Sequence, residues 1–173
     1  MHRPRILAIA VGVAWLASAS CGSGGGSSAP GAPEPGFSWA LPEGFPAPVV
    51  PDDNPMSTAK VELGRRLFYD TRMSANGTQA CASCHRPARA FTDGRVTSVG
   101  STGELHPRNA MSLTNVAYNS VQTWANPALV TLTDQALVPL LAERPVELGW
   151  SGHEAEILDR FREDPEYAAR FRD

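Results

Sequence analysis

The pentapeptide Cys81-Ala82-Ser83-Cys84-His85 limits what this chain can fold into more than any other part of its sequence. Two cysteines three residues apart share one face of a helical turn, so both thiols can bond to the two vinyl groups of one porphyrin. The next residue, a histidine, is then placed to bind the iron. The motif therefore predicts one haem c, attached through Cys81 and Cys84 and bound at its iron by His85.

Two other uses of paired cysteines agree less well with the rest of the sequence. A thioredoxin-like redox disulfide needs a βαβ context, and no run of residues has the alternation of strands. A zinc site needs four ligands, and there is no second C-x-x-C and no H-x-x-x-H motif. His106 and His153 are the only histidines besides His85 that follow the N-terminal segment.

Residues 1–20 have the layout of a secretory signal peptide. Arg3 and Arg5 are followed by an apolar run over residues 6–16 and then by small residues. The run is shorter than the roughly 20 residues that a membrane-spanning helix needs. The sequence fits two alternative cleavage sites. Ala17-Ser18-Ala19 fits an A-x-A site that releases a soluble protein, whereas Cys21 before a glycine-serine tether resembles the lipid-modified cysteine of a bacterial lipoprotein. Both predict a periplasmic location.

Proline and glycine divide the remaining chain. Residues 22–55 contain eight of the 15 prolines and seven of the 15 glycines, and such a segment cannot pack a core. We expect a flexible linker over residues 21–36 and an extended arm over residues 37–56, with irregular or polyproline-type backbone. The folded domain then covers residues 57–173.

The pattern of the folded part predicts an all-α domain with long loops. Ser57 can cap a helix in which Ala59, Leu63 and Leu67 recur at i, i+4 and i+8. We expect further helices over residues 78–85, 112–119 and 133–143, the last kinked at Pro139, one after a capping box at 151–154, and one after Asp164-Pro165. The formal net charge is −3 and no basic block exists, which argues against nucleic acid as a partner.

The sixth position of a haem bound by His85 is either filled or open. Met73 and Met111 are the methionines that could fill it, but core packing is the preferred interpretation of Met111, because methionine commonly fills gaps in a core. A filled position predicts a tethered single-haem cytochrome c, with His85 and Met111 as axial ligands, that only carries electrons. An open position predicts a haem that can react with peroxide.

Further short motifs occur around the pentapeptide in a specific order and spacing: Leu63-Gly64-Arg65-Arg66-Leu67-Phe68-Tyr69-Asp70, Ser74, Phe91-Thr92-Asp93-Gly94, Arg108-Asn109-Ala110, Asn115-Val116-Ala117-Tyr118-Asn119, Trp124 and Pro145-Val146-Glu147-Leu148-Gly149. With them, residues 57–173 resemble the bacterial di-haem cytochrome c peroxidase and MauG superfamily. The arm and residues 106–113 are most similar to the methanobactin-associated MauG-like di-haem enzymes, which act on a tryptophan of a partner protein.

The resemblance implies a cytochrome c-like haem domain, the N-terminal peroxidatic half of a haem-dependent oxidoreductase. Such an enzyme uses hydrogen peroxide to oxidise a small redox protein or a tryptophan of a partner protein. Glu147 matches the family's distal glutamate, which moves a proton during peroxide cleavage. Trp124 matches the tryptophan that relays electrons between the two haems. The side chain of Asn109 matches a ligand of a calcium ion at the domain interface.

The chain departs from this family in having no second C-x-x-C-H motif. The second haem and the remaining calcium ligands of the family lie in a C-terminal domain, so we expect that this sequence is truncated before a second haem domain. His106 also differs. Other peroxidases of the family carry a loop histidine that blocks the haem until activation, but His106 is closer to Arg108 than that histidine. A surface loop position for His106 therefore stays open beside that role.

Overall fold

The computed structural model describes residues 37–172, so the predicted signal peptide over residues 1–20 and the predicted linker over residues 21–36 lie outside the described residues. The described part is helical: α1 Thr58–Tyr69, η1 Thr71–Met73, α2 Cys81–Cys84, η2 Pro87–Arg89, η3 Val116–Tyr118, α3 Leu132–Leu141, α4 Glu154–Arg162 and α5 Pro165–Arg170. Within these residues, β-structure is limited to three isolated bridges. The prediction of an all-α fold with long loops is confirmed here.

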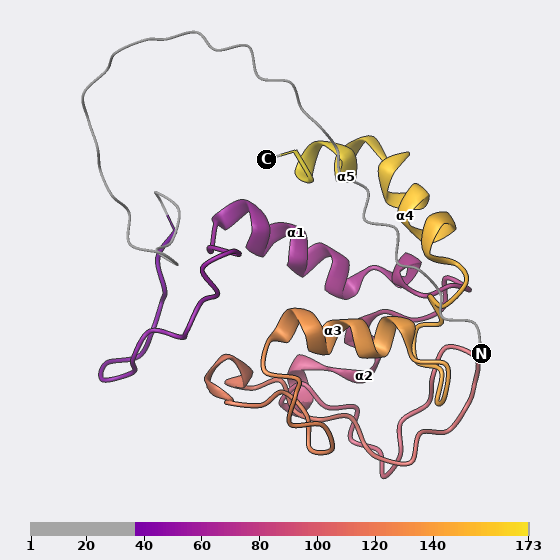
Figure 1. Cartoon of the computed structure of the whole chain (residues 1–173), viewed down its shortest axis with the longest axis horizontal. Helices are drawn as coiled ribbons and strands as arrows, with labels where there is room; N and C mark the ends of the chain where they lie inside the picture. Colours follow the sequence, from indigo (N-terminus) through magenta and orange to yellow (C-terminus); the bar gives the residue numbers. More distant parts are fainter. Residues whose placement is uncertain (1–36, 173) are drawn as a thin grey trace, which may run out of the picture.

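Side-chain caps mark the start of helix α1 and the start of the turn η1 that follows it. The Ser57 hydroxyl accepts a hydrogen bond from the Lys60 backbone N–H at 3.1 Å, as the sequence predicts. At the other end the Asp70 carboxylate accepts from the Arg72 backbone N–H at 2.9 Å, which starts the turn η1. The helix lies between α5 and α2 and packs against both (Figure 1).

The core is formed mainly by the last two helices. Ile157 and Phe161 of α4 and Tyr167 of α5 are buried, and a ring of partly buried apolar side chains packs around them: Leu63, Leu67, Met73, Ala75 and Trp150. Ile157, Phe161 and Tyr167 are therefore the buried apolar residues of these two helices, whereas Leu158 and Phe171 are exposed.

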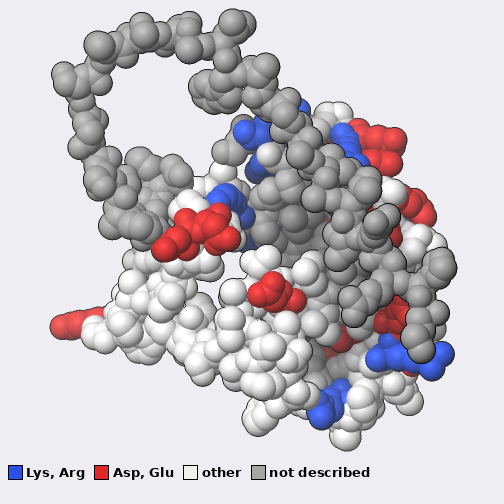
Figure 2. Space-filling view, viewed as in Figure 1, with Lys and Arg blue, Asp and Glu red and all other residues white. Residues whose placement is uncertain are grey.

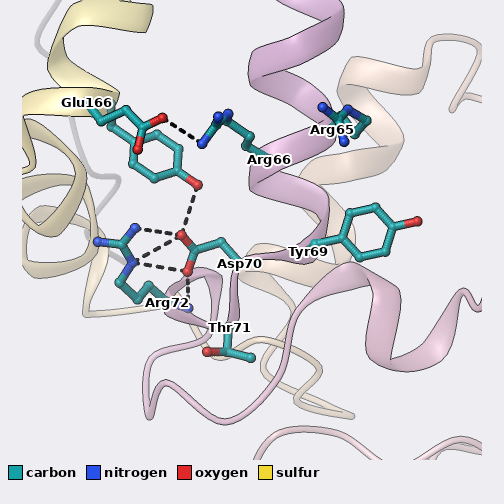
Figure 3. A pocket seen from close by; sticks show the side chains of 8 residues that line it. Arg65, Arg66, Tyr69, Asp70, Thr71, Arg72 and Glu166 are labelled. Atoms are coloured by element: carbon teal, nitrogen blue, oxygen red, sulfur yellow. Dashed lines mark hydrogen bonds and ion pairs between the residues drawn. The ribbon is translucent and has the colours of Figure 1, made fainter.

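An ionic network fixes α5 to the end of α1. Arg72 donates to both oxygens of Asp70 and, at 2.9 Å, to Asp164, the residue that caps α5. The Tyr167 hydroxyl donates to Asp70 at 2.9 Å (Figure 3). Arg65 and Arg66 nearby pair with Glu62 and Glu166, so the arginines that line this hollow all have carboxylate partners. The network serves to hold the fold together.

Three expectations for the helices are wrong. Residues 112–119 do not form an α-helix, because Asn115 adopts a left-handed conformation with φ 58° and only the 3₁₀ turn η3 follows. The capping box at 151–154 is absent, since His153 precedes α4 and the Ser151 hydroxyl instead donates to Glu143. Helix α2 has four residues rather than the eight expected over 78–85, because Asn76 closes a turn onto Thr78.

The arm over residues 37–56 contains no helix and leads away from α1 (Figure 1). It contacts the domain at Tyr118, whose hydroxyl donates to the Pro46 carbonyl at 2.8 Å and whose ring meets Phe45 edge to face. It also contacts α1, where the Lys60 ammonium group donates to the Asn54 side chain at 3.1 Å and to the Pro55 carbonyl at 2.9 Å. None of the helices in the described part is long and apolar enough to cross a membrane.

Charged side chains are unevenly distributed over the molecule. Residues 109–133 contain no aspartate, glutamate, lysine or arginine. In the orientation of Figure 1, the lower part of the surface is largely uncharged, whereas both signs of charge gather around α4 and α5 (Figure 2). The long loop before α3 therefore presents an uncharged face.

Candidate functional site

The two cysteines of the pentapeptide lie at the first and last positions of α2. They are free thiols and are partly buried. Burial raises the pKa of the Cys81 thiol, and the negative charge of Glu147 raises it further. Burial, Asp93 and Glu147 raise the pKa of the Cys84 thiol in the same way. Both thiols are therefore neutral near pH 7, and Glu147 lies close enough to act on each.

His85 ends α2, and its ring orientation is fixed by the backbone. Its backbone N–H donates to the Cys81 carbonyl, and its Nδ1 atom lies 2.9 Å from the Phe91 carbonyl oxygen. A carbonyl oxygen only accepts, so Nδ1 carries the ring proton and Nε2 is left with a free lone pair. This is the tautomer that a metal-binding histidine adopts.

The turn that supplies this carbonyl is unusual. Ala90 and Phe91 have φ values of 52° and 58°, in the left-handed region that residues with a side chain seldom adopt. The turn is held by the Phe91 N–H, which donates to the Arg86 carbonyl at 2.9 Å, and by the Ser112 hydroxyl, which donates to the Ala90 carbonyl at 2.6 Å. Strain of this kind persists only where surrounding contacts enforce it, and here it aims a carbonyl at His85.

Backbone hydrogen bonds hold the segment that contains Glu147 to three other parts of the chain. The Glu147 carbonyl accepts from Ser101 N–H at 2.8 Å, while the Leu148 N–H and carbonyl bond to Pro139 and Ala75 at 2.9 Å and 2.8 Å. Burial raises the pKa of the Glu147 carboxyl group, and a positive charge on His106, or to a smaller extent on His85, would oppose this. The Glu147 side chain is 39% exposed, so the carboxyl group is partly open to solvent.

The structure thus brings Glu147 toward Cys81, Cys84 and His85, whereas two other predicted residues are exposed to solvent. Trp124 is 86% exposed, in the loop between η3 and α3. Asn109 is also exposed. Within residues 37–172, no group of three or more histidine, cysteine, aspartate and glutamate side chains is arranged to hold a metal ion. The calcium ligand role of Asn109 stays a prediction.

The two methionines considered as axial ligands also differ in their surroundings. Met73 packs against the core cluster, and its carbonyl accepts a hydrogen bond from the Trp150 indole. Met111 is partly buried in a loop. The core contacts of Met73 leave Met111 as the methionine that a filled sixth position would use.

Sequence reasoning named two residues near this site as part of the motif over residues 91–94 but assigned neither of them a role. The first is Phe91, whose backbone carbonyl orients His85; a backbone acceptor leaves no sign in residue identity. The second is Asp93, which is 5% exposed and accepts a hydrogen bond from the Arg95 N–H at 3.0 Å. Its sequence, Asp93-Gly94, indicates only a turn, although a buried carboxylate also affects the Cys84 thiol.

These residues fit a covalently attached haem. Two free thiols lie one helical turn apart, and the adjacent imidazole presents an unprotonated Nε2 atom. A partly buried carboxyl group lies within electrostatic range of the imidazole and of both thiols. Two thioether bonds and one axial bond need this set of groups.

Comparison with known proteins agrees with this chemistry. The family model for di-haem cytochrome c peroxidase matches residues 58–173. Cytochrome-c peroxidase IdrP1 of Denitromonas iodatirespirans is 38% identical over 173 residues, which cover 99% of this chain and 42% of that protein. Methylamine utilization protein MauG of Methylorubrum extorquens is 34% identical over 131 residues, which cover 76% of this chain and 35% of MauG.

A solved structure is also similar. It is the crystal structure of a MauG-like protein associated with microbial copper homeostasis, with a TM-score of 0.75 and 54% sequence identity over 78% of this chain and 39% of that chain. The present chain therefore spans less than half the length of the relatives described here. Family match, sequence identity and fold agree, and the chain belongs to the di-haem cytochrome c peroxidase family.

Proposed function

We propose that this chain forms the N-terminal haem domain of a peroxidase-type oxidoreductase, which uses hydrogen peroxide to oxidise a small redox protein or a tryptophan of a partner protein. The observation that carries the proposal is the 2.9 Å contact between His85 Nδ1 and the Phe91 carbonyl. It leaves Nε2 free to bind iron, beside two thiols that are free to form thioether bonds.

Each residue of the site has one task. Cys81 and Cys84 would hold the porphyrin, and His85 would bind the iron. Haem c would supply a redox-active iron that can react with peroxide. Glu147 accepts a proton from one peroxide oxygen and delivers it to the other, so that water can leave. Its raised pKa brings the carboxyl group nearer to the pH at which it can both take up and release a proton.

Electrons reach the site through Trp124 in this proposal. The indole is 86% exposed and stands in a segment without charged residues, so a second protein surface or domain can contact it directly. A second haem, in a part of the enzyme beyond this chain, would lie on that side. Asn109, in the same uncharged segment, would contribute its amide oxygen to a calcium ion there.

The proposal includes export to the periplasm. The signal peptide over residues 1–20 would direct it, and Cys21 would receive a lipid anchor if the lipoprotein signal is used. Haem attachment to a C-x-x-C-H motif is consistent with an exported protein.

The test is the reaction of the haem-loaded protein with hydrogen peroxide, followed by stopped-flow absorption. Because proton transfer by a placed carboxyl group is worth roughly 100-fold or more in rate, Glu147→Gln should slow the reaction by about that factor. Glu154→Gln, which changes an exposed acid in the first turn of α4, is the matched control and should react at the unaltered rate. Equal rates for Glu147→Gln and the control would remove the proposed role of Glu147.

The same preparation distinguishes the electron carrier with His85 and Met111 as axial ligands. A carrier should show the absorption band of an iron–methionine sulfur bond, and Met111→Ala should abolish it. In the proposed enzyme Met111→Ala leaves the spectrum of the oxidised protein unchanged.

A further inference from the structure

The loop over residues 98–108 folds back on itself and is hydrogen-bonded to residues 146 and 147, which are called the Glu147 segment below. Its two sides are joined by the Val99–Leu105 bridge and by the His106 N–H, which donates to the Ser98 carbonyl at 2.9 Å. From this loop the Ser101 N–H donates to the Glu147 carbonyl at 2.8 Å, and the Glu104 carboxylate accepts from the Val146 N–H at 3.1 Å. The loop and the segment are therefore held in register by backbone contacts.

The imidazole of His106 lies at this contact, with both ring nitrogens toward the segment. Nε2 is 3.4 Å from the Val146 carbonyl oxygen, and Nδ1 is 3.7 Å from Oε1 of Glu147. The His106 side chain is only 11% exposed. Both distances are long for hydrogen bonds, as is common for catalytic contacts before substrate binds. The surface loop position considered for His106 is not what the structure has.

The carbonyl of Val146 decides where the protons of this ring lie. A carbonyl oxygen accepts only, so Nε2 carries a proton toward it. One proton can link Nδ1 to Glu147 in two ways. Either Nδ1 carries a second proton and faces a Glu147 carboxylate, or Nδ1 accepts the O–H of a protonated Glu147. In both arrangements a single exchangeable proton lies between Nδ1 and Oε1.

We propose that His106 is a positioning residue for Glu147, and that the two side chains share one proton and act as a pair. This inference rests on the proposed function and adds a residue to it. When Glu147 accepts a proton from peroxide, His106 holds the carboxyl group in place. When Glu147 gives the proton up, the imidazolium stabilises the carboxylate that remains. The net charge of the pair rises by one when Glu147 takes up the proton and falls by one when Glu147 releases it.

Other ionisable groups also face the pair. None of them is changed in the variants described below, so their effect on the pKa of Glu147 is the same in each variant that retains Glu147. Glu104 lies on the loop side, bonded to the Val146 N–H, and His85 lies on the α2 side within electrostatic range of Glu147. Cys81 and Cys84 are neutral thiols that become thioethers when haem is attached, so they add no charge. When protonated, His106 has the largest opposing effect on the pKa of Glu147.

The test uses the binding of hydrogen cyanide to the haem-loaded protein as a function of pH, followed by absorption. Hydrogen cyanide is neutral and must lose its proton to a base in the site, so its rate reports that base without any turnover. In the unaltered protein the rate falls at acid pH, where the pair takes up its second proton. His106→Gln retains an N–H group for the Val146 carbonyl but cannot titrate, so it removes the positive charge while preserving the contact.

The expected result for His106→Gln follows from that lost charge. The pKa of Glu147 rises, so the part of the profile in which the cyanide-binding rate falls with falling pH, the acid limb, moves to higher pH by about one unit. At a given pH within this limb, His106→Gln should therefore bind cyanide about tenfold more slowly than the unaltered protein. Glu147→Gln should bind cyanide slowly and without this limb. His153→Gln is the matched control, because His153 forms a similar pair with Glu156, at 3.4 Å, but on the exposed surface. Its profile should match that of the unaltered protein.

Three outcomes would overturn the inference. If the His106→Gln profile superimposes on the unaltered one while Glu147→Gln is slow, the contact is incidental and the proposed function survives. If Glu147→Gln also superimposes, the proposed role of Glu147 fails as well. If His106→Gln instead changes the resting spectrum from a six-coordinate to an open haem, His106 is an iron ligand and not a partner of Glu147.

Discussion

At the scale of single residues, the site depends on hydrogen bonds whose direction is fixed by an acceptor that cannot donate. The Phe91 carbonyl settles the tautomer of His85, and the Val146 carbonyl does the same for His106. Residue types alone predict that His85 binds iron, because the pentapeptide defines it. They do not predict either carbonyl partner, because every residue has the same backbone oxygen and only the fold decides where it points.

The Arg72 network gives a prediction at this scale. Asp70 accepts hydrogen bonds from Arg72 and Tyr167, and its side chain is only 15% exposed. Asp70→Asn leaves Arg72 partly unpaired, so it should lower the free energy of unfolding by about 1–3 kcal/mol in urea denaturation of the haem-loaded protein. Glu62→Gln, which breaks the exposed pair with Arg65, should change the free energy of unfolding far less, because solvent screens that pair.

The same residue makes stability depend on pH. Hydrogen bonds from Arg72 hold the pKa of Asp70 below its usual value. A carboxyl group with a lowered pKa in the folded state contributes stability above its unfolded pKa of about 4, and that contribution is lost as pH falls through the folded pKa. Asp70→Asn should therefore show a shallower loss of stability below pH 4. An acid profile identical to that of the unaltered protein would contradict this account of the network.

At the scale of elements, local signals predicted α1 and α5 well, because Ser57 and Asp164 cap these helices as expected. For α4 only the apolar face was predicted correctly: Ile157 and Phe161 are buried, but the expected capping box is absent. The prediction fails over residues 112–119, where the Ser112 hydroxyl bonds to the distant Ala90 carbonyl. A contact across more than twenty residues outweighs helix propensity there, and sequence pattern cannot reveal it.

Two glycines with opposite surroundings test the packing of these elements. A Cβ atom at Gly100 would overlap the Val146 carbonyl oxygen, whereas one at Gly64, inside α1, would meet open space. Gly100→Ala should lower the free energy of unfolding by about 1–3 kcal/mol. Gly64→Ala should raise it by about 0.5–1 kcal/mol, because alanine favours a helix. Urea denaturation of the haem-loaded variants checks both signs, and a stable Gly100→Ala protein would refute the close approach of the loop to the Glu147 segment.

At the scale of the whole molecule, the site draws its parts from segments far apart in sequence. Helix α2 supplies the thiols and His85, the loop over 98–108 supplies His106, and the segment before α4 supplies Glu147. The pentapeptide predicts the first part by itself. Glu147 could be proposed only from resemblance to a family, because a lone acid in a loop carries no signal of its own. Its pairing with His106 depends on a loop-to-loop contact that no local pattern encodes.

The central claim is that one haem c is bonded to α2 through both thiols. The direct measurement is the mass of the exported, mature protein after denaturation, made in a host that can assemble c-type cytochromes, together with the mass of the peptide that contains Cys81–His85. The account predicts that one haem stays on that peptide, and that Cys81→Ala/Cys84→Ala loses it. A colourless product of unmodified mass, with both of these thiols still reactive to a thiol reagent, would contradict the account.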